Sequence, residues 1–188
     1  LAAAQSAKRG NRTLLLERNN KLGKKLYITG KGRCNVTNAC DITEFMDNVP
    51  RNNKFLYSAI NAFGPKDLCA LIEENGVELK TERGKRVFPV SDKASDITKA
   101  LEAYMTKCGV EVRLNTQVDE ILTEGNAVAG VRCGGEIIPC RSVVIATGGL
   151  SYPLTGSTGD GLSFAQKLGH KVTETRPALV PLNAEEDW

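Results

Sequence analysis

The chain has 188 residues, about the size of one domain with part of another, and 41% of them are hydrophobic, as in ordinary globular proteins. The 25 lysines and arginines exceed the 22 aspartates and glutamates by too little to indicate a nucleic-acid partner. No run approaches the ~18 consecutive apolar residues of a membrane-spanning helix. We therefore expect a cytoplasmic globular protein with neither a nucleic-acid nor a membrane partner.

The N-terminal residues predict the second half of a βαβ unit. A helix over residues 1–10 ends at Gly10, and a short buried strand over 12–18 carries Glu17 near its carboxyl end. In dinucleotide-binding βαβ units a GxGxxG loop precedes the helix, and an acidic residue about 20 positions later binds the adenosine ribose. We expect the first strand and that loop to precede Leu1. Glu17 either binds a ribose with a free 2′-hydroxyl, as in FAD or NAD, or is a solvated strand end.

A polar, glycine-rich loop over residues 29–38, TGKGRCNVTN, follows this unit. Gly30 and Gly32 allow a ligand to approach the backbone closely, and the nearby cations suit a pyrophosphate or an electron-rich ring. These cations are Lys21, Lys24, Lys25, Lys31 and Arg33. A solvated charged loop is the alternative, and spacing alone favours it.

The six cysteines predict reduced thiols. Their positions, 34, 40, 69, 108, 133 and 140, give no CxxC pair and no zinc spacing, and His170 is the single histidine. No secretory segment opens the sequence, so we expect a reducing compartment and no bound metal. Cys34 follows Arg33, whose charge would lower the pKa of the thiol if the two side chains lay together.

The middle of the chain is predicted to consist of packing helices and short strands. Apolar spacing predicts helices over 54–63, 65–75 and about 91–109, with Ser91 or Ser95 as the cap of the last, and strands over 77–82, 86–91 and 110–116. Three alternating apolar runs over 117–140, separated by EGN and CGG, predict an antiparallel meander with tight turns. We assign these helices no chemistry.

Two glycine-containing segments follow the meander. Residues 142–146 predict a fully buried strand that leads into Thr147, Gly148 and Gly149, where a dinucleotide would pass the carboxyl end of a parallel strand; a plain turn is the alternative. The segment TGSTGDG then precedes a helix over 161–169. Its amides would favour an anionic ligand, or Asp160 would simply cap the helix.

Five features together resemble a prokaryotic FAD-dependent oxidoreductase family, commonly labelled NAD(P)/FAD-dependent or aminoacetone-oxidase-like, which includes bile-acid enone reductases. They are Glu17 at its strand end and the segments GKKLYITGKGRCNVTN, RVFPVSDKASDI, VVIATGGLSYPLTGSTGDG and RPALVPL. The resemblance implies an α/β fold: a doubly wound, parallel-sheet, Rossmann-like FAD/NAD(P)-binding domain with an antiparallel β-meander crossover, truncated at both ends. This domain would span 1–177, and 178–188 would begin an inserted second domain.

The resemblance also implies where FAD would lie. Glu17 would bind the adenosine ribose, the main chain of Val118 would meet the adenine, and residues 24–38 would line the pyrophosphate and the isoalloxazine. The implied cofactor-binding residues are Glu17, Lys24, Lys25, Thr29, Gly30, Gly32, Arg33, Cys34, Asn35, Val118, Ala146, Thr147, Gly148, Gly149, Gly159 and Asp160. Arg33 and Cys34 are the candidates for contact with the flavin ring, and Tyr152 is the candidate proton donor.

The implied function is transfer of a hydride or electron pair between FAD and a small organic substrate, with NAD(P)H as redox partner. A flavin-dependent oxidase or monooxygenase, and a flavin-binding module without turnover, are the alternatives. Because the sequence contains no GxGxxG, we expect the 188 residues alone to bind FAD weakly or not at all, and the activity to belong to the parent protein.

Overall fold

A computed structural model describes residues 1–177, and its first feature is a parallel pair of strands. β1 (Leu14–Leu16) pairs in parallel with β5 (Glu111–Arg113), with Leu14 opposite Glu111. The N–H of Glu17 extends the pairing to the carbonyl of Arg113 at 2.9 Å. Glu17 therefore lies at the carboxyl end of a parallel strand, as the sequence predicted.

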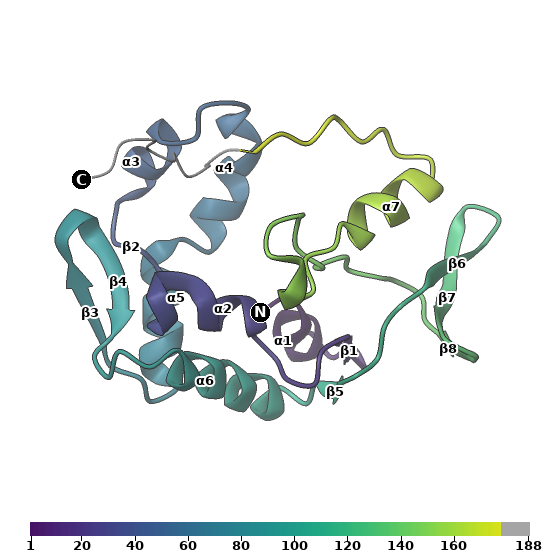
Figure 1. The fold of residues 1–188 in the computed structure, drawn as a ribbon, viewed down its shortest axis with the longest axis horizontal. Helices are drawn as coiled ribbons and strands as arrows, with labels where there is room; N and C mark the ends of the chain where they lie inside the picture. Colours follow the sequence, from purple (N-terminus) through teal and green to yellow (C-terminus); the bar gives the residue numbers. More distant parts are fainter. Residues whose placement is uncertain (178–188) are drawn as a thin grey trace, which may run out of the picture.

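Two helices pack over the β1–β5 pair. α1 (Ala2–Lys8) packs against α6 (Ala94–Lys107), and Ala4, which is completely buried, joins Tyr104 and Met105 in one hydrophobic cluster. Leu15 of β1 packs against the same cluster. Figure 1 shows α1, α6 and the β1–β5 pair grouped along one side of the molecule.

The second sheet has three strands. It is antiparallel, in the order β2–β4–β3, formed from β2 (Thr37–Asn38), β3 (Leu79–Glu82) and β4 (Arg86–Pro89). The hairpin of β3 and β4 turns through a 3₁₀ segment, η2 (Arg83–Lys85). Cys34, Ile72, Ala94 and Ile97 form the core between this sheet and its helices, α5 (Pro65–Glu74) and α6.

The remaining elements before β3 are short. They are α2 (Lys24–Ile28), the 3₁₀ segment η1 (Thr29–Gly32), α3 (Ile42–Asp47) and α4 (Asn53–Ala62). The sequence predicted α4 and α5 and missed α2, β2 and α3, because each is at most six residues long and lies within a polar stretch. α3 begins with a side-chain cap, since Asp41 accepts a hydrogen bond of 2.8 Å from the N–H of Glu44.

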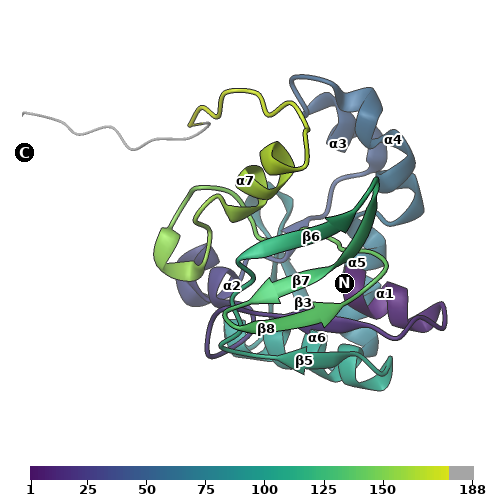
Figure 2. The ribbon, with the colours of Figure 1, turned by 90° about the vertical axis from the view of Figure 1, so that its right-hand side faces the viewer.

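The predicted antiparallel meander is confirmed. β6 (Glu120–Glu124), β7 (Ala127–Cys133) and β8 (Glu136–Pro139) pair in that order, and Figure 2 looks onto them. Gly130 is required in the central strand, because a Cβ there would lie 2.7 Å from the carbonyl oxygen of Ile138. The tight turns fall at EGN and CGG, as expected.

The predicted buried strand over 142–146 is wrong. The segment forms no regular structure, and Val144 and Ile145 are 72% and 41% exposed. A strand is held by hydrogen bonds to its neighbours, and within residues 1–177 no backbone N–H from 141 to 149 donates one. The apolar composition is that of a buried strand, but the described residues provide no third strand beside the β1–β5 pair.

Two helix starts also differ from prediction. α6 begins at Ala94, and Ser91 instead donates a 2.6 Å hydrogen bond to Asp96. α7 (Asp160–Lys167) follows a short 3₁₀ segment, η3 (Pro153–Thr155), and Gly159 rather than Asp160 occupies its cap position with φ +86°. Asp160 is therefore the first helical residue, which leaves its carboxylate available to a partner outside the helix.

The described residues also show the state of the cysteines, the length of the helices and the grouping of potential metal ligands. All six cysteines are free thiols. No helix among residues 1–177 combines the length and apolarity that crossing a membrane would require, and that range brings no three His, Cys, Asp or Glu side chains together as metal ligands. The expected start of a second domain, 178–188, lies outside the described residues.

Candidate functional site

The predicted ligand loop is a strained turn that follows α2. Gly30 and Lys31 both adopt left-handed conformations, with φ +57° in each case, and Cys34 does so with φ +64°. Lysine and cysteine adopt this conformation at a cost of about 1 kcal/mol or more each, so surrounding contacts must hold the turn. The carbonyl of Thr29 accepts the N–H of Cys34 at 3.1 Å, which closes the turn on itself.

The loop wraps around the buried ring of Phe88. Phe88 is 1% exposed in β4, and a Cβ on Gly30 would lie 2.6 Å from its ring and 3.1 Å from the backbone nitrogen of Asn35. Only glycine fits between the ring and the loop backbone. The N–H of Val36 then donates to the carbonyl of Val87 at 2.9 Å. The chain that follows the loop therefore pairs with β4.

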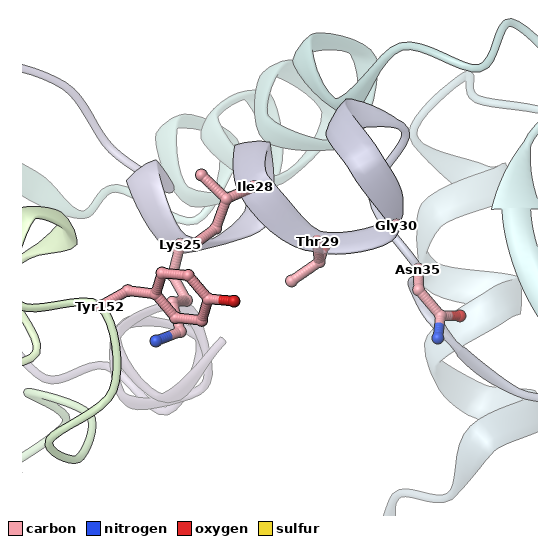
Figure 3. Close-up of a pocket in the computed structure, with 6 residues that line it drawn as sticks. All are labelled: Lys25, Ile28, Thr29, Gly30, Asn35 and Tyr152. Atoms are coloured by element: carbon pink, nitrogen blue, oxygen red, sulfur yellow. The ribbon is translucent and has the colours of Figure 1, made fainter. Parts of the chain in front are cut away.

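A cavity of about 360 Å³ lies against this loop (Figure 3). It is lined by Lys25, Ile28, Thr29, Gly30, Asn35 and Tyr152. Figure 3 shows Lys25 and Tyr152 at one end, Asn35 at the other and Thr29 between them. A volume of this size, with a few polar groups beside apolar surface, is typical of the part of a site that holds a ring of a ligand.

Lys25 and Tyr152 connect two distant parts of the chain at one end of the cavity. The ammonium of Lys25 donates to the carbonyl of Ser151 at 2.6 Å and lies 4.9 Å from the centroid of the Tyr152 ring. Tyr152 is 66% exposed and has a left-handed backbone, φ +54°. The segment around Ser151 and Tyr152 is thereby held against α2, and the Tyr152 ring lies at one end of the cavity.

Glu17 is oriented by its neighbour Asn19. Its Oε1 accepts both the backbone N–H and the side-chain amide of Asn19, at 2.8 and 2.7 Å, while Oε2 accepts no hydrogen bond from the described residues. The amide of Asn19 also donates to the carbonyl of Thr155 at 3.1 Å. The ERNN sequence, with two asparagines after a strand, is a turn signature that identifies this role in retrospect.

The start of α7 is attached to the same strand end. Arg18 donates to the hydroxyl of Thr158 at 2.7 Å and to the carboxylate of Asp160 at 3.1 Å. Thr158 also donates to Asp160 at 2.9 Å. Gly156, with φ +99°, is needed here, because a Cβ would lie 2.9 Å from the Asn19 amide. The predicted flavin segment around Asp160 therefore joins the Glu17 end of β1.

Hydrogen bonds place two further predicted regions, those of Val118 and of Thr147, near the same edge. The N–H of Thr116 donates to the carbonyl of Glu17 at 2.9 Å, which places the segment leading to Val118 beside Glu17. Thr147 accepts the N–H of Gly161 at 3.1 Å, and a Cβ on Gly148 would lie 2.9 Å from the buried Ser157 hydroxyl. Residues 146–149 are all exposed, as is Gly32 in the 29–35 loop, while Lys24 in α2 and Gly159 are half-buried.

Arg33 does not line the cavity. Its guanidinium forms a forked pair with Glu82, at 2.9 and 3.3 Å, reaches Asp92 at 3.2 Å and lies 4.0 Å from the centroid of Phe88. The hydrogen bond from Arg33 lowers the pKa of Glu82, and the pKa of Arg33 is raised in return. The sequence prediction that this charge faces a flavin ring has no support in its contacts.

Cys34 lies in the core, with none of its side chain exposed. Burial raises the pKa of its thiol, although a hydrogen bond with the Thr29 side chain opposes that effect. The expected lowering by Arg33 does not occur, because the guanidinium is directed to the two carboxylates instead. This environment is that of a core residue rather than of a reactive thiolate.

Comparison with known families decides the classification. Residues 1–178 match the family described as the HI0933-like protein Rossmann domain. The chain belongs to this HI0933-like family. The resemblance and the α/β fold class expected from the sequence are thereby confirmed at the level of family and Rossmann domain.

Three curated proteins similar in sequence to this HI0933-like chain carry two different names. The 3-dehydro-bile acid delta(4,6)-reductase of Clostridium scindens is 28% identical over 190 residues, covering 99% of this chain and 45% of that protein. The ribosomal RNA dihydrouridine synthases of Escherichia coli and Haemophilus influenzae are 31% and 28% identical, covering 95% and 98% of this chain and 44% and 46% of those proteins. The chain spans less than half the length of these relatives.

A solved structure agrees on the fold. The crystal structure of Thermovibrio ammonificans THI4 superposes with a TM-score of 0.50 at 16% identity, covering 78% of this chain and 52% of that one. At this identity the likeness concerns the fold alone.

Proposed function

We propose that the whole protein is an FAD-dependent reductase that saturates a carbon–carbon double bond conjugated with a carbonyl group, with NAD(P)H as the reductant. The observation that carries the proposal is the cavity between the strained 29–35 loop and Tyr152, in a Rossmann domain whose Glu17 stands at the carboxyl end of a parallel strand. The relatives' names support the reaction class, since a delta(4,6)-reductase and a dihydrouridine synthase both name saturation of such a bond.

The residues present fit FAD. Glu17 has a carboxylate oxygen without a partner among the described residues, and a ribose hydroxyl can donate to it. Lys25, Thr29 and Asn35 present polar groups around the cavity, and Gly30 lets the backbone of the loop lie directly against the Phe88 ring beneath it. When bound, FAD would supply the hydride that reduces the substrate. The main role of the chain is to bind and orient both molecules.

Tyr152 is proposed to supply the proton. Its phenol holds a transferable hydrogen at Oη at one end of the cavity, and the Lys25 ammonium, 4.9 Å from the centroid of the ring, helps to hold the ring in place. Because Tyr152 is 66% exposed, water can return the proton after each turnover.

The proposal is tested with the full-length protein under anaerobic conditions. We expect it to purify with FAD, to be bleached by NADH or NADPH, and to regain its colour when a 3-oxo-Δ4 steroid is added. Tyr152→Phe should leave FAD content unchanged and lower turnover by about 10²-fold or more. Recovery with oxygen but with no alkene supports an oxidase or monooxygenase instead, and FAD that no nicotinamide or oxygen cycles indicates a binding module.

A second candidate is the same reduction on uridine within RNA, which the names of two relatives favour. The near-balanced charge of the chain favours a small molecule. Supplying a uridine-containing RNA in place of the steroid distinguishes them: recovery of colour with RNA alone selects the second candidate.

A further inference from the structure

We propose that Arg33 is a positioning residue, which fastens the 29–35 loop to the β3–β4 hairpin and so sets the cavity edge at Gly30 and Asn35 without touching the cofactor. This inference rests on the proposed FAD site. It assigns a role different from the contact with the flavin ring that the sequence suggested.

The contacts of Arg33 all lead to the hairpin and its exit. Glu82 ends β3, Phe88 lies in β4, and Asp92 follows β4 with a left-handed backbone. The fork on Glu82 uses two guanidinium nitrogens, and the face of the same group covers the Phe88 ring. Arg33 and Gly30, three residues apart in the loop, thus both lie against the Phe88 ring.

The loop needs the contacts of Arg33 because of its backbone. Lys31 and Cys34 adopt conformations that these residue types avoid, so contacts with the rest of the chain must hold the turn. The buried side chain of Cys34 anchors the turn in the core. Arg33, the preceding residue, anchors it to the hairpin, and the N–H groups of Cys34 and Val36 report whether the turn stays closed.

The charges around Arg33 are already balanced within the hairpin. Lys80 lies 2.8 Å from Asp92 and 3.7 Å from Glu82, so two cations face two carboxylates. A guanidinium committed in this way differs from one that contacts an anionic cofactor, because removing Glu82 has opposite consequences in the two cases. If Arg33 holds the loop, removing Glu82 loosens the loop and weakens FAD binding. If Arg33 contacts the cofactor, removing Glu82 frees the guanidinium and strengthens FAD binding.

The experiment compares Arg33→Ala, Glu82→Gln and the double variant in the full-length protein, with Arg113→Ala as the control. Arg113 also pairs with two carboxylates, Glu111 on its own strand β5 and Glu136 on β8. We expect each single variant to weaken FAD binding about threefold to fivefold, the double variant to be no weaker than either, and the control to bind as the unmodified protein does. Arg33→Lys should restore binding only in part, because lysine cannot form the fork.

A cofactor-free measurement separates this inference from the proposed function. In hydrogen–deuterium exchange without FAD, Arg33→Ala and Glu82→Gln should both accelerate exchange at Cys34 and Val36, and Arg113→Ala should not. Tighter or unchanged FAD binding in Glu82→Gln beside weakened binding in Arg33→Ala overturns the inference, as does unchanged exchange in both. A full-length protein without FAD contradicts the proposed function, and the exchange result still decides the role of Arg33.

Discussion

The 29–35 loop and the 141–149 segment reverse the usual relation between composition and order. The loop is polar and glycine-rich, yet its turn is held by a buried cysteine, a buried phenylalanine and a forked ion pair. The segment is rich in valine and isoleucine, yet Val144 and Ile145 are exposed and its N–H groups donate no hydrogen bond within residues 1–177. A segment is ordered by the partners available to it, and its own hydrophobicity does not supply them.

The largest effect that would test this contrast is expected for Phe88→Ala. Phe88 is 1% exposed and supports Gly30, so its truncation should lower the free energy of unfolding by about 3–5 kcal/mol. Phe55→Ala is the matched control, because Phe55 is 86% exposed and should change that free energy by about 0.5 kcal/mol or less. Urea denaturation of the three proteins measures both. Equal effects would show that the loop has no rigid support.

Gly30→Ala should have the next largest effect. The added Cβ meets the Phe88 ring and the left-handed backbone is retained, so we expect a loss of about 1–3 kcal/mol in the free energy of unfolding. Gly84→Ala isolates the backbone contribution, since Gly84 has φ +74° and no atom within 4 Å of a Cβ. Thermal denaturation should rank Gly30→Ala well below Gly84→Ala, and the same melting temperature for both would contradict the close approach to Phe88.

The ion pairs of the loop should make its contribution pH-dependent. A hydrogen bond from Arg33 lowers the pKa of Glu82, and one from Lys80, with a second from Arg33, lowers the pKa of Asp92. These carboxylates bind protons less readily in the folded state than in the unfolded state. Their contribution to the stability of the folded state is therefore present at pH values above the ordinary carboxyl pKa of about 4, and it is lost as the pH falls below that pKa. The melting temperatures of the unmodified protein and Glu82→Gln should therefore differ at neutral pH and converge in acid. A constant difference would exclude a role for the charge of Glu82.

The smallest effect is expected in the 141–149 segment. Val144 is 72% exposed, so Val144→Ala should change the free energy of unfolding of the 188-residue chain by about 0.5 kcal/mol or less. Val87→Ala, the same substitution at a residue 2% exposed in β4, should cost about 2 kcal/mol. Urea denaturation measures both. A large cost at Val144 would show that the segment is packed after all.

Sequence reasoning succeeded where a local pattern determines the structure. The short run at Leu14–Leu16 placed Glu17 at a strand end, and the EGN and CGG turns fixed the meander. It failed where the deciding partner is remote. Arg33 is paired with Glu82, which lies 49 positions along the chain, and Lys25 with Ser151, 126 positions along, and no local spacing records either contact.

The same distinction explains the candidate site. Composition identified the 29–38 loop, and the family resemblance added Tyr152 and assigned both to one cofactor. The structure adds that Lys25 and Tyr152 lie together at one end of the cavity. It also shows that Cys34 anchors the loop in the core and that Arg33 packs on the Phe88 ring. Asn19, which orients Glu17, was not among the predicted site residues, although the ERNN turn signature indicates its role in retrospect.

The parallel pairing of β1 with β5 has a consequence for how the chain is made. Leu14 leaves the ribosome roughly one hundred residues before its partner Glu111. At synthesis rates of about 5–20 residues per second, β1 waits about 5–20 s for the strand that completes its hydrogen bonds. During that interval the α2–β4 region can already close around Phe88, because every partner it needs among Gly30, Arg33 and Glu82 has been made. The polar loop is then the early-formed part of this domain, and the apolar strand pair is the late one.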